Sequence, residues 1–154
     1  MLIRKPNYET SAQEVTAICY NEENRNLGYR IKCKDLKDLM ACVSIIKSYN
    51  DFDEGIVNEN LMKYAGFKKY YNPDNPNNGK DLLEFEIGRE SSPVMYIRYY
   101  AFSSPIQYQE NGEIKDFTKE LFETNMKRLA DFTGADECDF EEENLNNVCR
   151  LWWD

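Results

Sequence analysis

The feature that most constrains the fold is a long stretch of alternating side chains, Leu82–Phe102. Apolar residues alternate with charged residues in its first half, and with polar or aromatic residues in its second half. This period of two is typical of β-strands with one buried face. Between the halves lie turn-forming residues, namely Gly88, Ser91, Ser92 and Pro93. The stretch therefore predicts an antiparallel hairpin at the centre of a sheet.

The two faces of this hairpin also predict its register. A shift of one residue would move the whole apolar set into water, so Ile87 is expected opposite Met95. That register places Glu84 opposite Arg98, where an ion pair of ~0.2–1 kcal/mol is expected.

The second face of the hairpin carries Tyr96, Arg98 and Tyr100. An aromatic strip of this kind generally packs beneath a helix. Tyrosine and arginine are also enriched where proteins contact one another, so the alternative is an interaction face.

Further patterns place other elements around the hairpin. Strands are expected over residues 14–20, 28–34 and 105–110, and helices over 35–49, 58–71 and 116–132. Asp35 and Asn58 are the expected N-caps of the first two helices, and Gly134 is expected to end the third. A last helix is expected to begin at Asp139, because Glu142 follows it at the capping-box spacing. The 154 residues fit one domain. We therefore predict a single α+β domain, 1–154, with an antiparallel sheet of about five strands packed by three to four helices. The predicted order is roughly ββ-α-α-βββ-α-α, with an acidic helical segment at 135–154.

Composition removes several classes of chemistry. The chain has no histidine, which excludes Ser-His-Asp and Cys-His catalysis and most zinc hydrolases. The glycines are isolated, so neither a P-loop nor a dinucleotide-binding fingerprint is present. Five cysteines without Cys-x-x-Cys spacing are expected to be reduced core residues rather than metal ligands. We predict no cofactor and no metal.

The same composition bears on location. No apolar run approaches the ~18 residues of a transmembrane span, and the N-terminal residues lack the apolar core of a secretory signal. We therefore expect a cytoplasmic protein, in the host cytosol if it is phage-encoded, with no membrane partner.

The most informative pattern is the placement of charge. The net charge is −9, and the last 24 residues hold eight acidic residues and only one basic residue, Arg150. This clustering exceeds what helix capping requires. The candidate partner-binding residues in this segment are Asp136, Glu137, Asp139, Glu141, Glu142 and Glu143, with Tyr96, Arg98 and Tyr100 as a second patch.

This charge opposes direct binding to nucleic acid. An acidic surface can instead occupy the cationic groove of a nucleic-acid-handling protein, and complementary charge also speeds the encounter. Small acidic inhibitors, such as toxin-immunity proteins and phage anti-defence proteins (anti-CRISPR proteins among them), combine these features. We predict a non-enzymatic inhibitor of a basic nuclease or defence effector, acting as a nucleic-acid mimic. The simpler alternative is that the charge only keeps the protein soluble.

Two further hypotheses remain open. Asp74, Glu113 and Lys115 loosely follow a nuclease pattern, which would make the protein a carboxylate-based, metal-dependent enzyme. Alternatively, the protein is a subunit of a larger assembly that docks through Trp152 and Trp153, because tryptophan is a frequent interface anchor.

Overall fold

The computed structural model describes residues 10–19, 29–47, 50–100, 106–143 and 146–154. The four helices in these residues are α1 (Ser11–Cys19), α2 (Leu36–Ile46), α3 (Glu54–Ala65) and α4 (Lys119–Thr133). A five-stranded antiparallel sheet has the order β1 (Tyr29–Cys33), β3 (Glu84–Glu90), β4 (Ser92–Tyr100), β8 (Asn146–Trp152) and β7 (Glu137–Glu143). A smaller antiparallel sheet joins β2 (Lys69–Tyr70), β5 (Ile106–Glu110) and β6 (Glu113–Phe117). The predicted α+β class and the five-stranded antiparallel sheet are confirmed.

The central hairpin has the predicted register. In β3 and β4, Ile87 lies opposite Met95 and Glu84 lies opposite Arg98. The turn is tighter than predicted, because the ladder continues through Gly88 and Pro93 and reverses at Ser91, whose φ is 66°.

The predicted ion pair forms with a different carboxylate. Arg98 Nη2 lies 2.9 Å from Glu86 Oε2, one step diagonally across the ladder from Glu84. Diagonal neighbours of this kind are within reach of a long side chain. The prediction of the register was therefore correct, and the prediction of Glu84 as the partner was wrong.

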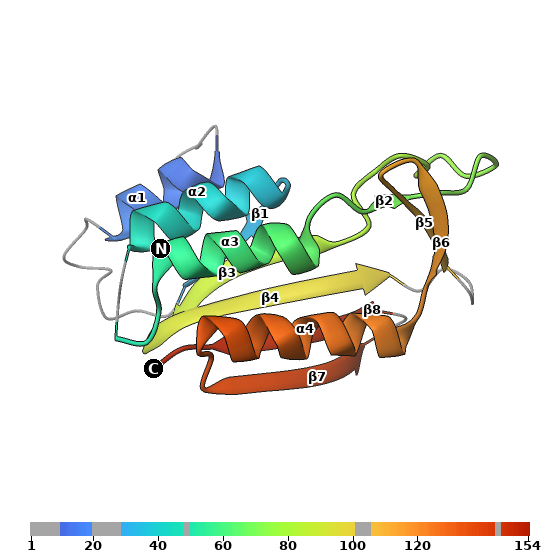
Figure 1. Ribbon diagram of the computed structural model, residues 1–154. Coiled ribbons are helices and arrows are strands. Elements are labelled where there is room, and N and C mark those ends of the chain that lie inside the picture. Colours follow the sequence, from blue (N-terminus) through green and yellow to red (C-terminus); the bar gives the residue numbers. More distant parts are fainter. Residues whose placement is uncertain (1–9, 20–28, 48–49, 101–105, 144–145) are drawn as a thin grey trace.

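One face of the main sheet is buried against the helices. Directly opposed residues of an antiparallel sheet point to the same side. A row of residues that are paired from one strand to the next therefore lies on a single face of the sheet. Two such rows belong to the hydrophobic core. The first consists of Ile31, Ile87, Met95, Leu151 and Cys138. The second consists of Cys33, Phe85, Ile97, Cys149 and Phe140. Figure 1 shows α3 and α4 side by side over the strands of this sheet.

The helix boundaries follow local capping chemistry. Asp35 caps α2 by accepting a hydrogen bond from Asp38 N at 2.8 Å, as predicted. Gly134 ends α4 in the left-handed conformation, also as predicted. The N-cap of α3 is Asp53, which accepts from Ile56 N, so the prediction of Asn58 as its cap was wrong. Asn58 instead donates to Met40 O in α2, at 3.2 Å.

The predicted strand at residues 14–20 is wrong, because Ser11–Cys19 forms helix α1. Thr10 and Gln13 satisfy each other's backbone N–H groups, each at 3.1 Å. This reciprocal pair is a capping box at the start of a helix. Among the described residues, the first strand of the sheet is therefore β1, which pairs antiparallel with β3 rather than with an N-terminal strand.

The predicted C-terminal helix within 135–154 is also wrong, because β7 and β8 form an antiparallel hairpin there. Its inward side chains alternate with a period of two, in Cys138 and Phe140 on β7 and in Cys149 and Leu151 on β8. Packing of this alternation against the core outweighed the capping-box spacing that had suggested a helix.

The smaller sheet extends beyond one end of the main sheet (Figure 1). The predicted strand at 105–110 appears as β5, and the Asn111-Gly112 turn that follows it has two positive φ angles, 52° and 80°. This is the geometry of a tight hairpin turn, and it leads into β6, which the sequence did not predict as a strand. Within the described residues, no helix combines the length and apolarity that crossing a membrane requires.

Candidate protein-binding face

The second face of the main sheet carries the candidate site, and we call it the open face. By the register it holds Arg30, Lys32, Glu84, Glu86, Val94, Tyr96, Arg98, Tyr100, Val148, Arg150, Trp152, Glu137, Asp139 and Glu141. In the described part of the chain, the helices pack against the core on the other side of the sheet. The expectation that a helix covers the Tyr96 strip is therefore wrong for these residues, and the alternative of an interaction face stays a prediction.

The two edge strands of the open face carry opposite charges. One row runs Lys32, Glu86, Tyr96, Arg150 and Asp139 from one edge of the sheet to the other. The edge strand β1 contributes Arg30 and Lys32, both exposed. The opposite edge strand, β7, contributes only carboxylates to this face.

Alternation along β7 divides the predicted acidic residues between two faces. Glu137, Asp139 and Glu141 are exposed on the open face, at steps of about 7 Å along the strand. They share this face with Tyr96, Arg98 and Tyr100, so the structure unites the two predicted patches into one surface. Tyr100 is 37% exposed, and Tyr96 and Arg98 are half-buried.

Of the remaining three predicted acidic residues, two lie outside the open face. Asp136 precedes β7 and accepts a hydrogen bond from Asp154 N at 2.7 Å. Glu142 lies on the helix-facing side and pairs with Lys119 of α4 at 2.5 Å. Glu143 lies in register with Asn146, and its side chain is outside the described structure.

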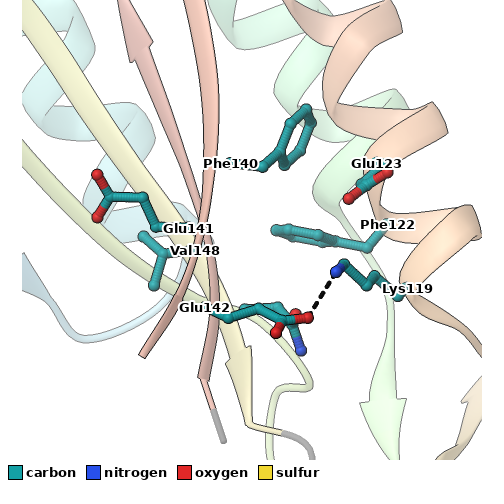
Figure 2. Close-up of a pocket in the computed structure, with 8 residues that line it drawn as sticks. Lys119, Phe122, Glu123, Phe140, Glu141, Glu142 and Val148 are labelled. Atoms are coloured by element: carbon teal, nitrogen blue, oxygen red, sulfur yellow. Dashed lines mark hydrogen bonds and ion pairs between the residues drawn. The ribbon is translucent and has the colours of Figure 1, made fainter. Parts of the chain in front are cut away.

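Glu142 is one of the residues that line a small hollow. It measures about 130 Å³ and lies between the start of α4 and the β7–β8 hairpin. Figure 2 shows Phe122, Phe140 and the Lys119–Glu142 pair on its helix side, whereas Glu141 and Val148 point away from α4. The volume is well below the ~300–1,000 Å³ of a typical small-molecule pocket. The side chains around it pack α4 against β7.

Arg150 organises the acidic half of the open face. Its guanidinium contacts Glu90 and Glu137, each at 2.7 Å, and Asp139 at 3.1 Å, so it joins β3, β8 and β7. Hydrogen bonds from Arg150 and then from Tyr96 hold the pKa of Glu90 below its ordinary value. Three carboxylates share this one guanidinium, so the cluster keeps a net charge of −2.

A second cluster organises the basic half. The Arg30 guanidinium lies 3.7 Å from the centroid of the Tyr96 ring, a cation–π contact, and it also pairs with Glu86. The Tyr96 hydroxyl donates to Glu90, and burial followed by this hydrogen bond raises the pKa of Tyr96. Tyr96 is therefore held in place by Arg30 on its ring and by Glu90 at its hydroxyl.

The two tryptophans at the end of the chain have different environments. Trp153 is completely buried and donates to Thr133 O at 3.0 Å, so it belongs to the core. Trp152 is half-buried on the open face and donates to Glu90 O at 2.9 Å. Of the two, only Trp152 is accessible on the open face.

The residues of the enzyme hypothesis do not form a cluster of metal ligands. Asp74 lies in the loop that follows β2, and Glu113 and Lys115 lie on β6, where they contact each other at 3.6 Å. Within the described part of the chain, no three side chains of the metal-binding types converge.

Sequence reasoning missed the residues that connect the site: Arg30, Glu86, Glu90 and Arg150. Each lies in a strand whose side chains alternate between the two faces of the sheet. The alternation along β8 would have placed Arg150 on the same face as Glu137 and Asp139. Because residues 135–154 were expected to form a helix, this alternation was not recognised. Comparison with protein-family models, with curated proteins and with solved structures finds no match for this chain.

Proposed function

We propose that the protein is a non-enzymatic binding protein whose open face docks and antagonises a basic, nucleic-acid-handling protein. The observation that carries this proposal is the row of carboxylates on the edge strand β7, on the same face as Tyr96, Arg98 and Tyr100. Evenly spaced carboxylates along one line resemble the charge pattern that a cationic groove meets on a nucleic-acid strand. The fixed aromatic and arginine side chains beside them supply the kind of contact that anchors protein interfaces.

The ion pairs distinguish the three carboxylates of β7 on this face. Arg150 holds Glu137 and Asp139 in place, whereas Glu141 lies beyond its contacts. Glu141 is therefore the carboxylate that can be replaced without dismantling the cluster. Glu142 is adjacent in sequence but points to the other side of β7, towards Lys119 (Figure 2). The two residues form a matched pair for testing the proposal.

The first prediction concerns this pair. Tagged wild type, Glu141→Lys and Glu142→Lys are used to capture proteins from the source cells, at low and high salt, with identification by mass spectrometry. A basic nucleic-acid-handling protein should be retained by wild type and by Glu142→Lys. Its affinity for Glu141→Lys should fall about tenfold, because a like charge then faces the basic partner, and high salt should weaken retention.

Inhibition is tested separately, by adding the purified wild type to the captured partner and measuring its activity on nucleic acid. Equal retention by both variants would contradict the open face as the docking site. Retention without inhibition would contradict the antagonist role.

A further inference from the structure

A second hollow, at the opposite edge of the main sheet, has the reverse charge. It measures about 430 Å³ and lies between the ends of β1 and β3 and the segment that follows the 72–79 loop. Its lining includes four lysines and two acidic residues, Lys32, Lys34, Lys69, Lys80, Asp81 and Glu84. These side chains give it a net charge of +2, in a chain of net charge −9.

Backbone hydrogen bonds fix one wall of this hollow. Gly79 N donates to Tyr70 O at 2.7 Å, Tyr70 N donates to Lys80 O at 2.8 Å, and Leu82 N donates to Lys68 O at 3.0 Å. Gly79 has a φ of 83°, which favours glycine at this position. The wall that carries Lys80 and Asp81 is therefore anchored to β2 rather than being a loose loop.

Three of the lining lysines differ in their surroundings. Lys69 pairs with Asp81, and the Lys80 ammonium donates to the neutral side chain of Asn77 at 3.1 Å. Lys32 is exposed on the open face, two residues from Arg30. Positive groups gathered around one cavity repel one another unless an anion lies between them.

We propose that this hollow binds a small phosphorylated molecule. Its volume lies within the ~300–1,000 Å³ of typical small-molecule sites. Lysine binds phosphate as a compact point charge, and several ammonium groups match an anion that carries more than one negative charge. A nucleic-acid strand is the less favoured occupant, because the net charge of −9 repels a long polyanion. The site is distinct from β7 and does not depend on the proposed inhibitory function.

The second prediction tests this site by titrating the full chain with inorganic pyrophosphate in a calorimeter. Wild type should bind, and Lys32→Gln/Lys80→Gln should bind about tenfold more weakly, because two ammonium contacts are lost. Lys37→Gln/Lys115→Gln removes the same charge from exposed positions outside the hollow, and it should bind like wild type. Glu84→Gln removes a carboxylate from the lining, so it should bind more tightly.

Three results would overturn the proposal. The first is no heat of binding with wild type. The second is equal weakening by the two double variants, which would mean that only the overall charge matters. The third is a short single-stranded oligonucleotide that binds more tightly than pyrophosphate and is sensitive to the same two lysines, because the hollow would then be part of a nucleic-acid surface.

Discussion

Arg150 is the residue on which the geometry of the open face depends most. It is the only basic residue in the last 24 positions of the chain, and it contacts carboxylates from β3 and β7. Because its side chain is only 21% exposed, these ion pairs are less screened by solvent than ordinary surface pairs. The carboxylate of Glu90 accepts hydrogen bonds from two side chains, Arg150 and Tyr96.

The third prediction follows from the lowered pKa of Glu90. A carboxylate whose folded-state pKa lies below its unfolded value stabilises the fold above the unfolded pKa. That stabilisation is lost as the pH falls from about 4.5, the ordinary value, through the folded-state pKa. Glu90→Gln should therefore be less stable than wild type at pH 7, by no more than about 1 kcal/mol for a half-exposed pair, and the difference should disappear at lower pH.

Urea unfolding at a series of pH values measures this difference. Glu59→Gln, an exposed substitution on α3, serves as the control and should show no such convergence. A constant offset between Glu90→Gln and wild type at every pH would show that the ionised carboxylate is not the cause.

At the scale of elements, local chemistry was sufficient where caps and periodicity agreed. Helix α4 was predicted almost completely, because its apolar spacing ends at a glycine suited to the left-handed conformation. The start was misplaced, since Thr118 is the N-cap, accepting from Leu121 N at 3.1 Å, and residues 116–117 belong to β6. Prediction failed in the C-terminal segment, where a capping-box spacing suggested a helix but alternating side chains pack against the core as two strands.

The fourth prediction concerns the end of α4. Gly134 has a φ of 71°, and an added Cβ would meet its nearest atom, Asp51 O, at an ordinary 3.8 Å. Gly134→Ala should therefore destabilise the protein by about 1–2 kcal/mol through backbone conformation alone. Gly55→Ala, in the first turn of α3 at an ordinary φ, should be neutral or slightly stabilising. Thermal unfolding of both variants checks this, and equal effects would refute the conformational explanation.

At the scale of the whole molecule, the C-terminal residues connect distant parts of the chain. The Trp153 ring meets the Phe52 ring edge to face at a centroid distance of 5.2 Å, and its N–H group binds the end of α4. Asp51 N donates to Asp154 O at 3.1 Å. The last strand thus joins the helical layer to the sheet through residues about a hundred positions apart.

The fifth prediction tests this connection. Trp153→Ala removes a completely buried ring and should lower the free energy of unfolding by about 3–5 kcal/mol. Trp152→Ala, one residue earlier on the open face, should cost clearly less because that ring is only half-buried. Denaturant unfolding compares the two variants, and similar losses would mean that Trp153 does not connect the layers as described.

The sequence alone determined the class of fold, the central hairpin with its register, the N-cap of α2, the glycine that ends α4, and the concentration of acid near the C-terminus. These properties depend on neighbours within a few residues or on a single period of side chains. Tertiary structure decided the rest. It placed Arg150 among Glu90, Glu137 and Asp139, and it gathered lysines from β1, β2 and the 79–81 segment around one hollow. The physical reason is that strand pairing brings together residues far apart in sequence, so which charges meet depends on the order of strands in the sheet.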